Sequence, residues 1–206
     1  MSILSKYDLF IFDWDGTLCS SPVLSDVLHF FVKEFRIRTW GGAAKFGIDI
    51  DAAEKAAERK SKIFAELYEV YDLFFKAKPM PNAVRLLGFL KRKKKTAIFS
   101  DGMKYRLLKE TRNFGLSKYM DFILSASSID RYKPNPTGLF LIARKLNVSR
   151  KRCIYIGDMN IDVRTAKFAG MDSCAIASGL DSYATLKEER PTYIFRSLRA
   201  FLDAME

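Results

Sequence analysis

The feature that most constrains the fold is a run of four apolar residues, 9–12, that ends directly in the sequence DWDGT, residues 13–17. A short run of this kind predicts a strand buried on both faces of a parallel sheet. Gly16 favours a turn after it. Asp13 and Asp15 therefore follow the carboxyl end of a strand, where open α/β sheets bind ligands. We expect both side chains to point the same way, and like charges so close require a cation or a proton.

Five further segments share this apolar, strand-like character, and helical patterns separate them. We predict strands at residues 96–99, 122–124, 153–156, 174–177 and 193–195. We predict helices at residues 82–94, 104–113, 137–146 and 160–169. Because strands and helices alternate, the fold class we expect is α/β, with a doubly wound parallel sheet.

The alternation breaks between the first strand and residue 80. Helical patterns occupy residues 23–35, 43–46 and 52–75, and we expect no strand among them. An all-helical insertion at the turn after a strand would form a lid over the site. We therefore predict an α/β core of residues 1–17 and 80–206, and a helical cap of residues 18–79.

Two later motifs carry groups that suit phosphate chemistry. The strand predicted at 96–99 ends in Ser100-Asp101-Gly102, where a hydroxyl and main-chain amides can donate to phosphoryl oxygens. Lys133 lies in the sequence KPNP, and an ammonium there can bridge an anionic nucleophile and an anionic phosphate. An ordinary turn would explain the first motif alone, and a surface lysine the second.

A third motif places acids at the end of the strand predicted at 153–156. Asp158 lies at the strand end and would reach a metal ion directly. Asp162 comes one helical turn later and would hold a metal-bound water or position Lys133. It would also be a favourable acid in a first helical turn. Oxygen ligands favour magnesium over zinc.

These motifs, in this order, resemble the haloacid dehalogenase superfamily in its phosphatase branch. The place of the helical insertion resembles the subfamily of phosphoglycolate phosphatase and β-phosphoglucomutase. The resemblance implies that Asp13 is the nucleophile and that Asp15 is the proton donor and later the base. It implies that the phosphoryl group is held by Ser100, Asp101, Gly102 and Lys133. It also implies that Mg²⁺ is held by Asp13, the main-chain carbonyl of Asp15 and Asp158, with Asp162 behind them.

Two residues depart from the family pattern. Trp14 stands where a smaller residue is common, and we expect it to face away from the site and to affect packing only. Asp101 stands where Asn or a small residue is common. Its carboxylate would repel a phosphorylated substrate unless Lys133 or an amide offsets the charge.

The reading that these residues favour is a magnesium-dependent phosphatase that acts on a small phosphorylated metabolite, with phosphoglycolate-like compounds first. Asp15 favours ester cleavage over dehalogenation, because a leaving alkoxide must be protonated. One alternative is a phosphosugar mutase with the same first step. An alternative of another class is a basic protein that keeps the fold and binds nucleic acid or another anion.

The formal net charge of +11 is compatible with binding to nucleic acid. The densest cationic run, residues 91–95, contains no aromatic residue, so we interpret it as a solvated face and expect no nucleic-acid partner. Charges interrupt every apolar run, and no signal-peptide pattern begins the sequence, so we expect no membrane partner. Three cysteines without paired spacing indicate buried thiols in a reducing cytoplasm. We expect a cytoplasmic monomer or homodimer.

Overall fold

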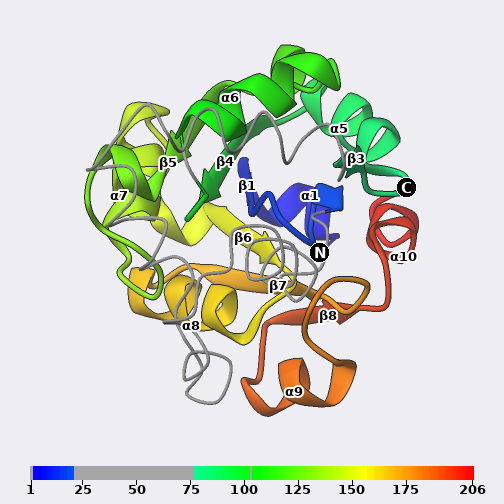
Figure 1. Ribbon diagram of the computed structural model, residues 1–206. Helices are drawn as coiled ribbons and strands as arrows, with labels where there is room; N and C mark the ends of the chain where they lie inside the picture. The colour runs from blue at the N-terminus through cyan, green and yellow to red at the C-terminus, as the bar shows by residue number, and fades with distance from the viewer. Residues whose placement is uncertain (1, 21–76, 103) are drawn as a thin grey trace, which may run out of the picture. The chain divides into compact units, whose positions relative to one another are not determined.

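A six-stranded parallel sheet lies at the centre of residues 2–20, 77–102 and 104–206, which the computed structural model describes (Figure 1). Its strands lie in the order β5-β4-β1-β6-β7-β8, and each pairs in parallel with its neighbours. Their bounds are β1 Leu9–Phe12, β4 Lys95–Ser100, β5 Phe122–Ser125, β6 Cys153–Gly157, β7 Asp172–Ile176 and β8 Tyr193–Phe195. The predicted fold class and all six predicted strands are confirmed.

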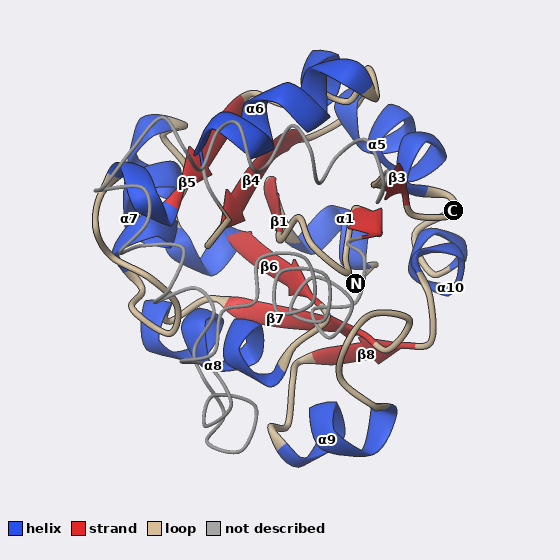
Figure 2. Cartoon of the chain, viewed as in Figure 1, coloured by secondary structure: helices blue, strands red, loops and turns tan. Residues whose placement is uncertain are grey.

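The four predicted core helices are also present, drawn in blue in Figure 2. They are α5 Ala83–Lys91, α6 Lys104–Asn113, α7 Thr137–Lys145 and α8 Asn160–Ala169. Sequence reasoning missed three shorter helices of four to six residues each: α1 Ile3–Lys6, α9 Tyr183–Glu188 and α10 Leu198–Asp203. A helix of this length has too few turns to show a periodic apolar face.

Strand β1 is the most enclosed part of the sheet, because its four residues are wholly buried. Leu9 and Ile11 pack into one apolar cluster with residues of α7 and α8. Phe10 points to the other face, where its ring centroid lies 6.5 Å from that of Phe201 in α10. Helices on both faces thus exclude water from β1, and β1 is fixed between β4 and β6.

The expectation of no strand between residues 18 and 79 is wrong at its two ends. Strands β2 (Cys19–Ser20) and β3 (Lys78–Pro79) form a separate two-stranded sheet. The Met80 amide also donates to the Leu18 carbonyl at 2.9 Å. The two ends of the insertion are therefore joined by backbone hydrogen bonds, in strands too short to leave a sequence pattern.

The helical cap predicted for residues 18–79 falls mainly on residues outside the described ranges. Met1–Ser20 and Pro79–Glu206 make up one compact unit, to which the whole six-stranded sheet belongs. The helices predicted at 23–35, 43–46 and 52–75 lie outside the described residues. The cap and its boundaries stay a prediction.

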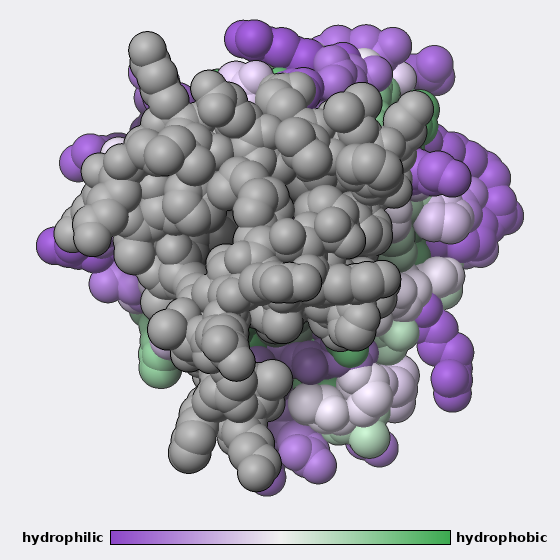
Figure 3. Space-filling view, viewed as in Figure 1, coloured by the Kyte–Doolittle hydropathy of each residue, from purple (hydrophilic) through white to green (hydrophobic). Residues whose placement is uncertain are grey.

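Three of the five cations at residues 91–95 make local polar contacts at the surface. Lys91 pairs with Asp121 at 2.5 Å, and Lys94 lies 3.2 Å from Asp8. The ammonium of Lys95 donates to the Leu146 carbonyl. Hydrophilic residues are prominent at the rim of the described surface visible in Figure 3. These contacts give the run a local structural explanation, and the absence of a nucleic-acid partner stays a prediction.

The cysteines and the apolar segments bear on two expectations drawn from composition. Cys19, Cys153 and Cys174 are all buried, as expected of small apolar side chains. Burial raises the pKa of the Cys153 thiol to about 12. Within the described part of the chain, no helix combines the length and apolarity that crossing a bilayer requires.

Trp14 does more than fill space, which corrects the expectation of packing effects alone. Its side chain is wholly buried and stacks on Phe114, with ring centroids 6.2 Å apart. The indole N–H donates to Oε2 of Glu110 in α6 at 2.6 Å. Glu110 is itself buried, with 4% of its surface exposed. Trp14 therefore links the turn after β1 to helix α6 through a charge-assisted hydrogen bond.

Substituting Trp14→Phe should lower the free energy of unfolding by about 1.5–3 kcal/mol, because a buried carboxylate loses an N–H donor. Urea unfolding followed by circular dichroism measures the change. In Trp14→Phe/Glu110→Gln the loss should be smaller than the sum of the two single losses, because both remove the same contact. Strictly additive losses would contradict a shared hydrogen bond.

Candidate active site

The predicted site residues lie at the carboxyl ends of three neighbouring strands. Asp13 follows β1, Ser100 ends β4 and Asp158 follows β6. Because β1 lies between β4 and β6 and all three are parallel, their carboxyl ends meet at one edge of the sheet. Lys133 comes from the segment between β5 and α7, and Asp162 from the first turn of α8.

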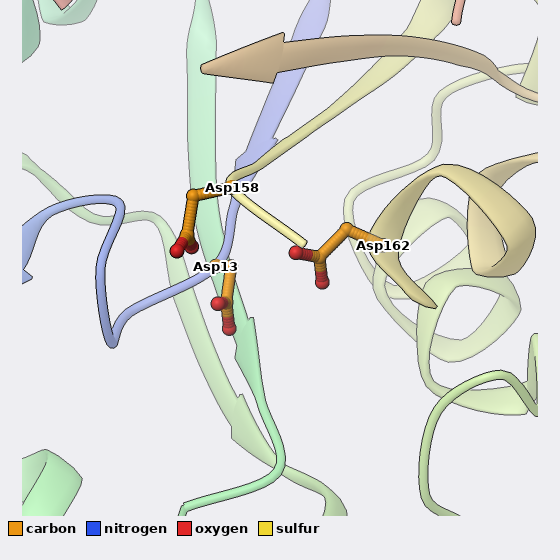
Figure 4. Close-up of side chains that lie close together, drawn as sticks. All are labelled: Asp13, Asp158 and Asp162. Carbon is orange, nitrogen blue, oxygen red and sulfur yellow. The ribbon is translucent and has the colours of Figure 1, made fainter. Parts of the chain in front are cut away.

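Three carboxylates converge at this edge. Asp13, Asp158 and Asp162 each offer an oxygen, and these oxygens lie within 4.8 Å of one another (Figure 4). All three side chains are at most 3% exposed. Desolvation raises the pKa of Asp13, and neighbouring carboxylates add to that rise. Desolvation, followed by the charge of Asp162, raises the pKa of Asp158 to about 7.

The Lys133 ammonium lies among these acids. Nζ is 2.9 Å from Oδ1 of Asp13 and 2.8 Å from Oδ1 of Asp162, and the side chain is 5% exposed. Burial by itself lowers the pKa of Lys133, but the carboxylates of Asp13 and Asp162 raise it well above its ordinary value. Lys133 is therefore a charged ammonium at neutral pH, in a site that excludes most water.

Asp162 is held from three sides. Besides Lys133, the hydroxyl of Tyr155 lies 3.2 Å from Oδ1, and the Met159 amide donates to Oδ2 at 3.0 Å. Tyr155 is buried, and its hydroxyl also donates to the Phe99 carbonyl at 2.9 Å. These contacts orient the Asp162 carboxylate toward Lys133. Sequence reasoning did not identify Tyr155, because a tyrosine in a strand is read as core.

Asp158 is fixed by a hydroxyl and an amide. Thr17 donates to Oδ1 at 2.7 Å, and the Leu180 amide donates to Oδ2 at 2.7 Å. A Cβ on Gly16 or on Gly179 would lie 2.1 Å from Oδ2, so both positions require glycine. Thr17 belongs to the DWDGT sequence but received no role from sequence reasoning. The segment after β7 was missed because its contribution is a main-chain N–H, which any residue except proline supplies.

Asp15 lies beyond the end of β1, so the turn rather than strand alternation positions its side chain. Its carboxylate accepts from Nη1 of Arg106 at 2.8 Å, and Nη2 of Arg106 contacts the other carboxylate oxygen. The buried group of three carboxylates does not include that of Asp15. The cation that accompanies Asp15 is an arginine of α6, which sequence reasoning did not single out.

The predicted phosphate-binding segment forms a tight turn after β4. The Gly102 amide donates to the Ser100 hydroxyl at 3.0 Å, and the hydroxyl of Ser125 donates to the Gly102 carbonyl at 2.6 Å. Asp101 accepts from the Lys133 amide at 3.1 and 3.2 Å through its two oxygens. An amide of Lys133 thus offsets the charge of Asp101, one of the two compensations considered for that residue.

The donor set fits a hard divalent cation. Three buried carboxylates face one ammonium, so when all are ionised the cluster carries a net double negative charge. Magnesium and similar ions prefer oxygen ligands and bind through one or two carboxylates together with substrate phosphate. The buried cysteines are not part of this group. Each of the three acids also has protein partners, because Lys133 contacts Asp13 and Asp162. Thr17 and the Leu180 amide donate to Asp158.

Lys133→Met should lower the free energy of unfolding by about 3–5 kcal/mol at pH 7, because it leaves the Asp13 and Asp162 carboxylates buried without their cation. The matched control, Lys187→Met, removes an exposed lysine and should change stability by less than about 0.5 kcal/mol. Urea unfolding of both variants without divalent metal makes the comparison. Similar losses in the two variants would show that the Lys133 contacts contribute no more than a surface charge.

The sequence model of haloacid dehalogenase-like hydrolases matches residues 7–170. Phosphoglycolate phosphatase 1 of Pseudomonas aeruginosa is 25% identical, over 94% of this chain and 78% of the relative. A phosphoglycolate phosphatase of Pseudomonas fluorescens is 24% identical with the same coverage.

Solved structures show the same fold. A crystal structure from Haemophilus somnus, described as a predicted phosphoglycolate phosphatase, aligns with a TM-score of 0.76. The alignment covers 98% of this chain and 99% of that one, at 22% identity.

Proposed function

The chain belongs to the haloacid dehalogenase-like hydrolase family, and from that premise we propose that it is a phosphoric monoester hydrolase with Asp13 as its nucleophile. The observation that carries the proposal is the buried Lys133 ammonium, in contact with Asp13 at the strand end. A carboxylate that attacks an anionic phosphate needs a nearby cation to offset their repulsion. In this proposal Lys133 supplies that charge beside Asp13.

In the first step, a carboxylate oxygen of Asp13 forms a bond to phosphorus as the ester bond between phosphorus and the leaving oxygen breaks. Asp15 gives its proton to the leaving oxygen, so the alcohol departs neutral and Asp15 becomes a carboxylate. Lys133, the Ser100 hydroxyl and the amides of the turn at Gly102 hold the transferred phosphoryl group. The product of this step is an aspartyl phosphate on Asp13.

In the second step, Asp15 takes a proton from a water molecule, whose oxygen then attacks phosphorus. The bond between phosphorus and Asp13 breaks, inorganic phosphate leaves, and both carboxyl groups return to their starting states. The first step uses the proton of Asp15 and the second step restores it, so no further proton carrier is required.

Mg²⁺ is the cofactor we propose, held by Asp13, the Asp15 carbonyl and Asp158, with Asp162 behind them. When bound there, the ion would offset the negative charge of the carboxylates and the phosphoryl oxygens. The donor chemistry and the charge of the buried acids support this assignment.

The substrate we propose is a small phosphorylated metabolite, with phosphoglycolate-like compounds first. The relatives named phosphoglycolate phosphatase, at 22–25% identity, support that class. The location in the cytoplasm and the monomeric or homodimeric state stay predictions from the sequence.

Asp13→Asn should abolish phosphate release from an aryl phosphate, because an amide cannot form the aspartyl phosphate. We expect a loss of at least about a thousandfold, or roughly 4 kcal/mol in the barrier. Circular dichroism shows whether the variant keeps its fold. Activity within tenfold of the unaltered protein would remove Asp13 from the role of nucleophile.

Mg²⁺ should raise the thermal unfolding midpoint of the metal-free protein, because a ligand that binds only the folded state stabilises it. At a concentration one hundred times the dissociation constant, the gain is about 2.7 kcal/mol. Asp158→Asn should lose most of this shift. Asp203→Asn, which alters an exposed acid, should keep it. An equal shift in Asp158→Asn would place the ion elsewhere.

A further inference from the structure

Arg106 brings a second, partly buried cation to the site. It belongs to α6, and its side chain is only 14% exposed. Its guanidinium makes a two-pronged contact with both oxygens of Asp15. Planar guanidinium groups recognise carboxylate and phosphate with the same geometry, so a group that holds Asp15 this way is also suited to a phosphoryl oxygen pair.

The guanidinium lies beside the phosphate-binding turn. A Cβ built on Gly102 would be 2.5 Å from Nη2 of Arg106, 3.3 Å from the Ser100 hydroxyl and 3.3 Å from Oδ2 of Asp15. One small region therefore borders Ser100, Gly102, Asp15 and Arg106. The glycine leaves room there for the arginine, and any larger residue at position 102 would displace it.

Arg106 is also held from behind. Its Nη1 lies 3.7 Å from Oε2 of Glu110, one helical turn further along α6. Glu110 is fixed in turn by the Trp14 indole. Two carboxylates, those of Asp15 and Glu110, thus share one guanidinium. If Asp15 released it, Glu110 would still retain it at the site.

Asp15 cannot act as the proton donor as long as both of its carboxylate oxygens contact Arg106. An Asp15 that transfers a proton to a leaving oxygen must direct a carboxyl oxygen at that atom. The guanidinium must therefore release at least one oxygen in the reactive complex. Its Nη2 lies next to Gly102 and the Ser100 hydroxyl, in the segment proposed to bind phosphate.

We propose, on the basis of the phosphatase function above, that Arg106 is a substrate-binding residue that supplies a second cation to the phosphoryl group. When the phosphoryl group enters, Nη2 moves from Asp15 to a phosphoryl oxygen, while Glu110 keeps its contact with the guanidinium. The same exchange exposes one oxygen of Asp15 to the leaving oxygen. Substrate binding and the release of the proton donor are thus one event.

Calorimetric titration of the full chain with inorganic phosphate, in the presence of Mg²⁺, tests this proposal without requiring turnover. Arg106→Ala should weaken phosphate binding by at least about tenfold, the effect of losing a charge-assisted hydrogen bond. Arg106→Lys keeps the charge without the two-pronged geometry, so its affinity for phosphate should lie between those of Arg106→Ala and the unaltered protein. Arg112→Ala, which removes an exposed arginine of the same helix, should bind phosphate within about twofold of the unaltered protein.

Steady-state kinetics with an aryl phosphate supply a second readout. Arg106→Ala should raise KM and lower kcat together, because both substrate binding and the release of Asp15 depend on the exchange. If Arg106→Ala does not fold, as judged by circular dichroism, Arg106→Lys carries the test, with phosphate binding at least about threefold weaker than in the unaltered protein.

Phosphate binding that is unchanged or tighter in the folded variants would overturn the proposal, since Arg106 would then only hold or block Asp15. Such a result in an otherwise active enzyme leaves the phosphatase function standing. By contrast, an unaltered protein that neither hydrolyses the aryl phosphate nor binds phosphate would overturn both proposals.

Discussion

The Lys133 ammonium lies between the carboxylates of Asp13 and Asp162, and the rest of the site depends on that contact. Burying three acids within 4.8 Å of one another is costly unless positive charge accompanies them. One ammonium balances one of these charges. Desolvation is the main cause of the raised pKa values of Asp13 and Asp158, and neighbouring carboxylates add to it. A divalent cation would offset the negative charge that remains.

The sheet explains how groups so far apart in sequence meet. Parallel pairing places the ends of β4, β1 and β6 side by side, and burial of β1 on both faces fixes the position from which Asp13 projects. Hydrogen bonds then fix the orientation of the carboxylates. Thr17 and the Leu180 amide hold Asp158, and the Met159 amide holds Asp162. The site is thus preorganised in its main chain as well as in its charges.

The six strands of the sheet and the meeting of Asp13, Ser100 and Asp158 at one edge could be predicted from the sequence. The six strands are short apolar runs between polar segments, and parallel topology then brings Asp13, Ser100 and Asp158 to one edge. Strands β2 and β3 and helix α1 could not be predicted, because two to four residues carry no usable periodicity.

The contacts of single side chains were harder to predict. Arg106 lies in a helix that contains several other cations, and nothing in the sequence separates it from a solvated arginine. Its position became clear only from its contact with Asp15 and from the space left by Gly102. Trp14 was expected to pack, and its bond to Glu110 depends on a residue 96 positions away.

The most direct test of this account is to find where the phosphoryl group resides during turnover. The unaltered protein would be mixed with an aryl phosphate and Mg²⁺, quenched in acid within the first turnover, digested and examined by mass spectrometry. The account predicts a phosphorylated peptide that contains Asp13, with a phosphoryl group that hydroxylamine removes, as an acyl phosphate requires. Turnover with the phosphoryl group on Ser100, or with none on the Asp13 peptide at any quench time, would contradict it.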